Sequence, residues 1–151
     1  MIKFIDVFNR KQVGVLAPRE NTAIISISEP GAAALLRHGW NPILRLEFHD
    51  LCDSDKVLKN DTFFTEEMAN TLWDFIHENK DRNFVVHCDA GISRSVAVGQ
   101  IISELFPDTH ELKLHAVRDT RFANPLVLRL MHKKFWNEKL NDLNEADILL
   151  I

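Results

Sequence analysis

Residues 84–105 read FVVHCDAGISRSVAVGQIISEL and predict a strand, a loop and a helix in succession. The first four residues, 84–87, form an apolar, β-branched run that is typical of a buried strand. Beyond Arg94, apolar side chains recur at the spacing of one helix face, at Val98, Ile101, Ile102 and Leu105. The loop therefore runs from the end of a strand into the N-terminus of a helix.

The rest of the chain alternates between strand and helix patterns in the same way. Further runs predict buried strands at 23–27 and 43–48 and an edge strand at 3–8. Helical patterns are present at 31–38, after an N-cap at Thr65, and after an N-cap at Asn124 that is followed by Pro125. Strands that alternate with helices predict an α/β fold with a central, mostly parallel sheet flanked by helices.

The composition predicts one globular domain. The chain has 151 residues, of which 46% are hydrophobic and 26% are charged. Its formal net charge of −4 argues against nucleic acid as a partner, because binding to a phosphate backbone usually shows as a basic excess. Residues 140–151 are a candidate C-terminal appendage, and their apolar end, 148–151, predicts packing on the same domain.

The sequence also predicts a compartment. No segment approaches the roughly 18–20 consecutive apolar residues that cross a bilayer, so we expect no membrane partner. The N-terminal residues lack the apolar run and cleavage site of a secretory signal, and two cysteines, Cys52 and Cys88, are too few for a disulfide-rich secreted fold. We therefore expect a cytoplasmic protein in which a thiolate can act. The sequence predicts nothing about the oligomeric state.

The loop after residue 87 has the features of an anion site with a nucleophile. Backbone N–H groups converge where a strand end meets a helix N-terminus, and they stabilise negative charge there. A free thiol, with a pKa of about 8.5, is only about 3% ionised at pH 7, but helix N-termini and cations bring thiol pKa values down to about 3.5–7.5. We therefore expect Cys88 to be a thiolate. Arg94 adds a planar fork of donors that suits bidentate binding of a phosphate.

Residues 87–95, HCDAGISRS, resemble the His-Cys-x5-Arg-Ser/Thr loop of the cysteine-based protein tyrosine phosphatases, in the form found in small dual-specificity-like phosphatases of bacteria and phages. The resemblance spans roughly residues 20–140 and implies a dual-specificity-phosphatase-like fold. It implies that Cys88 attacks phosphorus to form a cysteinyl-phosphate and that Arg94 binds the phosphoryl oxygens. It further implies that Ser95 assists the sulfur as it leaves and that His87 orders the loop.

The resemblance also implies a phosphate cradle of backbone N–H groups. These belong to Asp89, Ala90, Gly91, Ile92, Ser93 and Arg94. Gly91 would allow the tight turn, since glycine adopts a positive φ at little cost.

The resemblance also implies a general acid, an aspartate in a loop some thirty to forty residues before the cysteine. Asp50, Asp53 and Asp55 all lie in that interval. We favour Asp50, because it follows the predicted strand 43–48 directly, where family members keep the acid. Spacing alone does not choose among the three, because loop insertions are easily tolerated. A positioned carboxylic acid contributes about 10²–10⁴-fold to such a reaction.

Three other residues are candidates for lesser roles. Cys52 lies in the segment with the candidate acids, where a reversible disulfide with Cys88 is one hypothesis and a bystander thiol the simpler one. Arg121 and Asn124 lie in a polar connection from which related phosphatases bring a side chain to the pocket. For Asn124, a plain helix cap is the stronger interpretation.

Other functions fit the sequence less well. The spacing from Cys88 to Arg94, the serine after the arginine and the upstream aspartates favour a phosphatase over a sulfurtransferase or an arsenate-reductase-like enzyme, and sulfur transfer would need no general acid. A non-catalytic phosphate-binding module usually lacks either the cysteine or the arginine. The histidines show no paired spacing for a metal and the glycines are scattered, so we expect no metal and no cofactor. The expected substrate is a phosphorylated protein or a small phosphomonoester, with phosphotyrosine or another aryl phosphate as first choice. The acidic Asp89 weighs against inositol lipids.

Overall fold

The computed structural model describes residues 2–108 and 111–150, with the backbone alone described for residues 143–150. Within these residues, five strands form one all-parallel sheet in the order β3-β2-β4-β1-β5. The strands are β1 (Ile5–Asn9), β2 (Thr22–Ser28), β3 (Ile43–Glu47), β4 (Asn83–Cys88) and β5 (Leu112–Leu114). The predicted α/β fold with a mostly parallel sheet is confirmed.

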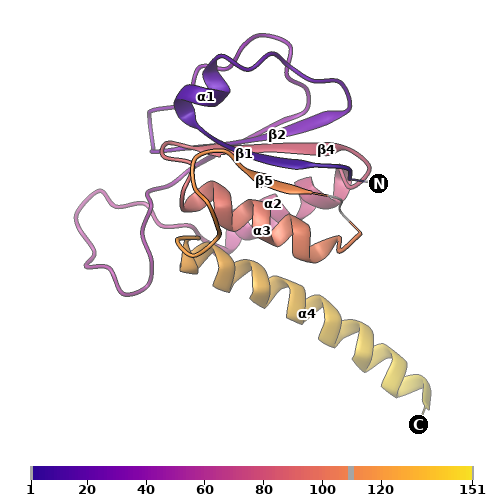
Figure 1. Ribbon diagram of the computed structural model, residues 1–151. Helices are drawn as coiled ribbons and strands as arrows, with labels where there is room; N and C mark the ends of the chain where they lie inside the picture. The colour runs from indigo at the N-terminus through magenta and orange to yellow at the C-terminus, as the bar shows by residue number, and fades with distance from the viewer. Residues whose placement is uncertain (1, 109–110, 151) are drawn as a thin grey trace.

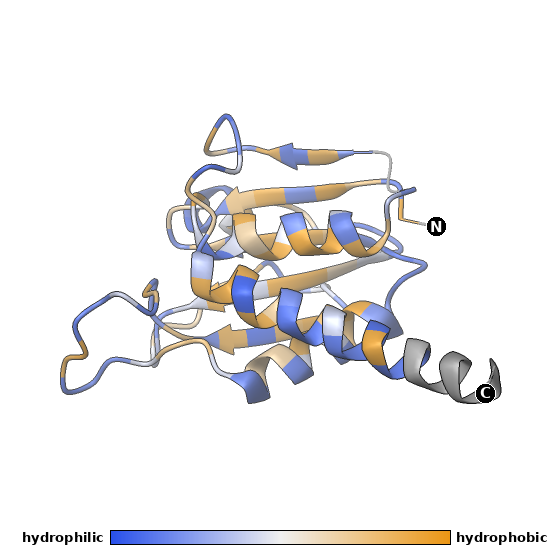
Figure 2. Cartoon of the chain, turned by 90° about the horizontal axis from the view of Figure 1, so that it is seen from below, coloured by the Kyte–Doolittle hydropathy of each residue, from blue (hydrophilic) through white to orange (hydrophobic). Residues whose placement is uncertain are grey.

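Helices cover both faces of this sheet (Figure 1). They are α1 (Arg10–Gly14), α2 (Glu66–Glu78), α3 (Arg94–Leu105) and α4 (Pro125–Leu150). The short α1 lies on one face, and the three longer helices lie on the other, with α4 extending past the sheet toward the C-terminus (Figure 1). Hydrophobic positions run along the strands, whereas the segment between β3 and α2 is largely hydrophilic (Figure 2).

The two central strands carry the core. Every residue of β2 and β4 is buried, which explains their continuous apolar sequence pattern. Because successive side chains of a strand point to opposite faces, these strands contribute side chains to two hydrophobic clusters. Ile25 and Val86 belong to the large cluster with the longer helices, whereas Ile24 and Val85 pack with Trp40 in a smaller one.

Two predicted helix starts are confirmed. The side chain of Thr65 accepts a hydrogen bond from the Met68 N–H at 3.1 Å and caps α2. Asn124 Oδ1 accepts from the Val127 N–H at 3.0 Å and caps α4, which begins at Pro125 as predicted. A capped N-terminus satisfies an N–H group that has no partner within the helix.

The prediction of an edge strand at 3–8 is wrong. Strand β1 lies inside the sheet between β4 and β5, and its apparent alternation comes from the buried Asp6. That carboxylate is paired with Arg19 at 2.6 Å and with His115 at 2.7 Å. The edge strands are β5 and β3, and Ile43 of β3 is 41% exposed although a buried strand was predicted there.

The prediction of a helix at 31–38 is also wrong, since this described segment holds no helix. The carbonyl oxygens of Ala32 and Ala33 accept hydrogen bonds from Arg10, and that of Ala34 accepts from Arg45. A helix would bind these carbonyls to its own N–H groups. The short helix α1, which the sequence analysis missed, follows β1 through a capping box between Asn9 and Gln12.

The C-terminal segment continues α4 as far as Leu150. Asn141 and Asp142, near the start of the candidate appendage, are exposed. The predicted packing of residues 148–151 lies outside the described side chains. Among the described residues, no helix combines the length and apolar character that crossing a bilayer requires.

Candidate active site

The candidate site lies at the carboxyl edge of the sheet. Cys88 is the last residue of β4, the middle strand, and pairs in register with Asn9 at the end of β1. Phe48 and Asp50 follow β3 at the same edge, because all strands run parallel. Open parallel sheets bind their ligands at this edge. The fold thus gathers two predicted residues, Asp50 and Cys88, from separate parts of the sequence.

The Cys88 sulfur has two hydrogen-bond contacts, one with a backbone amide and one with a hydroxyl. Its side chain is buried, with 1% of the residue exposed. Sγ lies 3.3 Å from the Gly91 N–H and 3.0 Å from Ser95 Oγ. Ser93, the N-cap residue of α3, makes no side-chain cap in the described structure, so the first amides of α3 receive no side-chain partner from it. An anion at this helix N-terminus would fill that role.

Gly91 is required for two reasons. Its φ is +70°, in the left-handed region that favours glycine. A Cβ at this position would also lie 2.7 Å from the Asn9 backbone nitrogen and 2.9 Å from the Phe8 carbonyl oxygen. The 88–94 loop therefore packs directly on the end of β1, and this contact fixes its shape.

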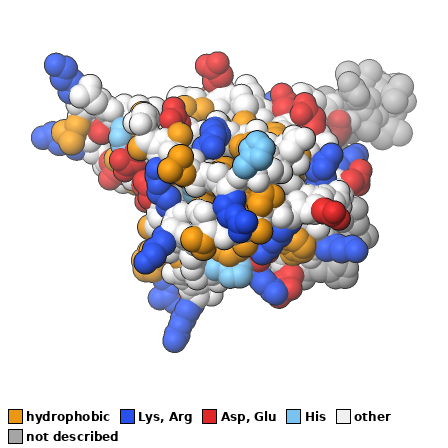
Figure 3. Space-filling model, turned by 90° about the horizontal axis from the view of Figure 1, so that it is seen from above, with side chains coloured by type: hydrophobic (Ala, Val, Ile, Leu, Met, Phe, Trp, Pro, Cys, Tyr) orange, Lys and Arg blue, Asp and Glu red, His pale blue; other side chains and the backbone are white. Residues whose placement is uncertain are grey.

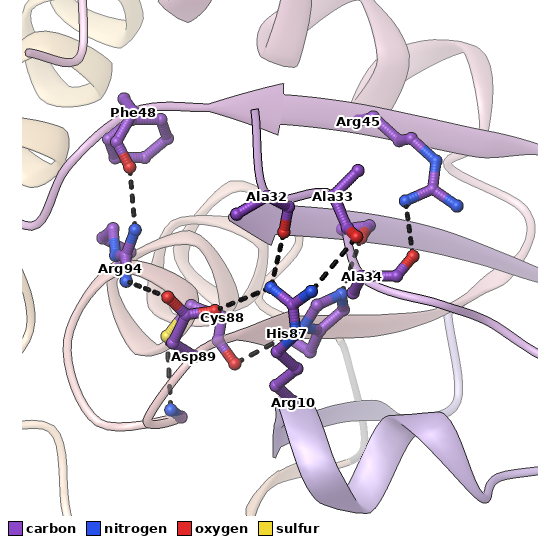
Figure 4. Close-up of polar contacts among 12 residues, drawn as sticks. Arg10, Ala32, Ala33, Ala34, Arg45, Phe48, His87, Cys88, Asp89 and Arg94 are labelled. Carbon is purple, nitrogen blue, oxygen red and sulfur yellow. Dashed lines mark hydrogen bonds and ion pairs between the residues drawn. The ribbon is translucent and has the colours of Figure 1, made fainter. Parts of the chain in front are cut away.

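Arg94 is held in the loop by two contacts, and one of its buried nitrogens has no partner among the described residues. The residue is only 4% exposed, and its Nη1 donates to the Phe48 carbonyl at 2.7 Å (Figure 4). Nη2 lies 3.5 Å from Asp89 Oδ2. Its Nε, although buried, has no hydrogen-bond partner among the described residues. A buried donor without a partner is costly, so this guanidinium can donate a hydrogen bond to a bound oxyanion.

Asp89 joins two arginines at the rim of the loop. Its carboxylate lies 3.3 Å from Arg10 Nη1 as well as near Arg94, and its carbonyl accepts from the Arg10 N–H at 3.1 Å (Figure 4). Arg10 in turn holds the carbonyls of Ala32 and Ala33. On the face that carries α1, basic, acidic and hydrophobic side chains are intermixed (Figure 3). The positive charge beside Cys88 is therefore local to this arginine pair and the start of α3.

His87 is neutral and structurally engaged. It is completely buried, and its Nε2 lies 2.6 Å from Ser26 Oγ on β2. Its Nδ1 lies 3.4 Å from the Cys88 carbonyl, which can only accept, so Nδ1 carries the hydrogen and Nε2 accepts from the serine hydroxyl. Burial lowers the pKa of His87 from 6.5 to about 4. His87 therefore links β2 to β4 in its uncharged form.

The three candidate acids have different surroundings. Asp50 Oδ1 accepts from Ser93 Oγ at 2.7 Å and from Asn124 Nδ2 at 2.8 Å, which places it against the 88–94 loop. Asp53 instead forms a bidentate pair with Arg129, at 2.7 and 3.1 Å. Asp55 accepts from the Cys52 N–H at 2.7 Å. Of the three, Asp50 is the carboxylate that the structure brings to the loop.

The remaining candidates, Asn124, Arg121 and Cys52, also differ in their surroundings. Asn124 serves both as the cap of α4 and as a contact to Asp50, so the two interpretations are compatible. The Arg121 side chain is 70% exposed and binds Asp119, away from the loop contacts. Cys52 Sγ lies 3.1 Å from Ser54 Oγ, and both described cysteines are free thiols, so no disulfide joins them here.

Three contributors were missed by sequence reasoning. Arg10 lies in a helix too short for a periodic signal, and the Phe48 carbonyl contributes a backbone atom that no residue type reveals. Ser26 is a polar residue inside an otherwise apolar strand, and that interruption was the one available signal.

Comparison with known proteins finds no matching family model, no matching curated protein and no matching solved structure. The function is therefore argued from the geometry of the site itself.

Proposed function

We propose that this protein is a cysteine-dependent phosphatase that hydrolyses phosphate monoesters. One observation carries the proposal: Cys88 Sγ contacts the Gly91 N–H and the Ser95 hydroxyl, in a loop whose arginine has a buried Nε without a hydrogen-bond partner among the described residues. This arrangement supplies a nucleophile and a tetrahedral oxyanion site at one point. A metal is not needed for such a reaction, because the arginine and the amides provide the positive field.

The proposed reaction has two steps. In the first, the Cys88 thiolate attacks phosphorus, the bond from phosphorus to the ester oxygen breaks, and Asp50 donates a proton to that leaving oxygen. In the second, water attacks the cysteinyl-phosphate, the sulfur–phosphorus bond breaks, and Asp50 takes the proton from water. The Ser95 hydroxyl, 3.0 Å from Sγ, stabilises the departing sulfur. The products are the alcohol and inorganic phosphate.

The proposed substrates are phosphotyrosine, in a phosphorylated protein, and small aryl phosphates. Asp89 places a carboxylate beside Arg94, which disfavours a second anionic group near the scissile phosphate. We place the activity in the reducing cytoplasm, where a nucleophilic thiol stays reduced.

The test is hydrolysis of 4-nitrophenyl phosphate in the presence of a metal chelator. The wild type should turn over and be inhibited by vanadate, Cys88→Ser should lose at least about 10³-fold in kcat, and Asp50→Ala about 10–10³-fold. Cys52→Ser is the matched control and should stay within about twofold. The proposal is wrong if Cys88→Ser keeps wild-type activity, or if the protein transfers sulfur from thiosulfate but releases no phosphate.

A further inference from the structure

A buried amide joins Asp50 to two other parts of the fold. Asn124 is 1% exposed, and its Nδ2 donates to Asp50 Oδ1 at 2.8 Å and to the Leu51 carbonyl at 3.0 Å. Its Oδ1 caps α4, and its backbone N–H donates to the Ser93 carbonyl at 3.1 Å. This one residue therefore joins the start of the 49–62 loop to both α4 and the 88–94 loop.

The two oxygens of Asp50 have different surroundings. Oδ1 accepts from Asn124 Nδ2 and from Ser93 Oγ, whereas Oδ2 has no hydrogen-bond partner among the described residues. Protonation of an oxygen that already accepts two hydrogen bonds is unfavourable, because the added hydrogen would face the two donors. When Asp50 is protonated, the proton therefore lies on Oδ2, the oxygen left free for a substrate.

We propose that Asn124, together with Ser93, positions Asp50 so that proton transfer runs through Oδ2. This inference rests on the proposed phosphatase function. In the first step the Oδ2 proton moves to the ester oxygen as the phosphorus–oxygen bond breaks and the sulfur–phosphorus bond forms. In the second step Oδ2 takes a proton from water as water bonds to phosphorus and the sulfur leaves. Oδ1 stays bound to Asn124 throughout and keeps the carboxyl group in one orientation.

The neighbouring ion pair does not share this role. Arg129, also on α4, binds Asp53 of the same loop, but the two side chains are 54% and 60% exposed. Ion pairs that are this exposed contribute little, because water and salt screen them. Arg129 therefore provides a matched control: it lies on the same helix and contacts the same loop, but not the proposed acid.

The experiment compares kcat/KM for two substrates that differ in their need for an acid. Phenolate is a poorer leaving group than 4-nitrophenolate. Loss of proton donation therefore slows the hydrolysis of phenyl phosphate more than that of 4-nitrophenyl phosphate. Asn124→Ser keeps an oxygen that can cap α4 but lacks the amide that reaches Asp50. We expect it to lower kcat/KM about 10-fold or more for phenyl phosphate and about twofold for 4-nitrophenyl phosphate. Asn124→Ala should change the ratio of the two kcat/KM values as much as Asn124→Ser does, and it should also lower the Tm.

Each outcome decides a separate point. Arg129→Gln should stay within about twofold of the wild type for both substrates. The positioning role is overturned if Asn124→Ser lowers kcat/KM equally for both substrates. It is also overturned if Arg129→Gln changes the ratio of the two kcat/KM values as much as Asn124→Ser does. In either case the phosphatase function stands. If the wild type hydrolyses neither substrate, the proposed function falls and this inference with it.

Discussion

At the scale of single residues, burial decides which groups carry charge. His87 and Arg94 are both buried beside Cys88, yet the histidine is neutral and the guanidinium is charged at all ordinary pH values. Burial lowers the pKa of the histidine, because the desolvation of its charged form outweighs the opposing effects of the Cys88 carbonyl and the Asp89 carboxylate. The loop thus keeps its one cation at Arg94, where the proposed phosphate would bind.

This burial predicts a pH dependence of stability. Below pH 6.5 an unfolded histidine takes up a proton, whereas folded His87 does so only near pH 4, so stability falls as the pH falls through that window. Between pH 7 and pH 5 we expect His87 to account for a loss of about 2 kcal/mol. Urea unfolding at both pH values measures this loss in the free energy of unfolding. His87→Gln should show a correspondingly smaller loss, whereas the exposed control His38→Gln should match the wild type. Equal losses in all three proteins would contradict the assignment.

At the scale of secondary-structure elements, side chains from distant positions replace local hydrogen bonds. The segment 29–42 is irregular because Arg10 and Arg45 bind the carbonyls of Ala32, Ala33 and Ala34. It carries Leu35, which is almost fully exposed. This segment therefore depends on a few side-chain contacts rather than on a helix of its own.

Removal of one arginine should loosen this segment alone. Arg10→Gln frees two carbonyls and should raise the rate of thermolysin cleavage near Leu35 several-fold, while the free energy of unfolding falls by less than about 1.5 kcal/mol. Mass spectrometry of the fragments locates the cut. Arg37→Gln changes an exposed arginine of the same segment that makes no hydrogen bond among the described residues, and it should cleave like the wild type. Unchanged cleavage of Arg10→Gln would show that the arginine does not hold the segment.

These elements also show what the sequence could predict. Strands β2 and β4, helix α3 and the caps at Thr65 and Asn124 were predictable, because their signals are local and agree with their tertiary surroundings. Strand β5 has three residues and no periodic signal. The order of β1 in the sheet depends on pairing with segments some 80 to 110 residues away, which no local pattern encodes.

The residues of the candidate site likewise fall into those with a local sequence signal and those that only distant contacts identify. Cys88, Gly91 and Arg94 lie within seven consecutive positions, so their spacing revealed the loop. The choice of Asp50 over Asp53 and Asp55 needed the contacts with Ser93 and Asn124, which come from 43 and 74 positions away. The Arg10 contact likewise joins residues 79 positions apart.

At the scale of the whole molecule, the 88–94 loop links the elements on both faces of the sheet. It packs on the end of β1, begins α3, and contacts the loop after β3 through Arg94 and Ser93. An anion bound there would therefore stabilise the folded state as a whole, since the site exists only when all of these elements are in place.

Inorganic phosphate should raise the thermal stability measurably. At 100 times its Kd, a ligand that binds only the folded state adds about 2.7 kcal/mol, or roughly 5–10 °C in Tm for a chain of this length. Scanning fluorimetry with increasing phosphate measures the shift, with sodium chloride at equal ionic strength as the control. Arg94→Lys keeps the charge but loses the planar fork, and its shift should be much smaller. An equal shift for both proteins would argue against phosphate binding at Arg94.

The position of β1 has a consequence for how the molecule is assembled. Among the described strands, β1 is made first but lies between β4 and β5, so its two neighbours do not exist until the chain has been made as far as residue 114. High contact order of this kind slows folding, because distant segments must meet before any pairing is gained. We therefore expect the 88–94 loop to take its final shape late in folding, because it packs on the end of β1.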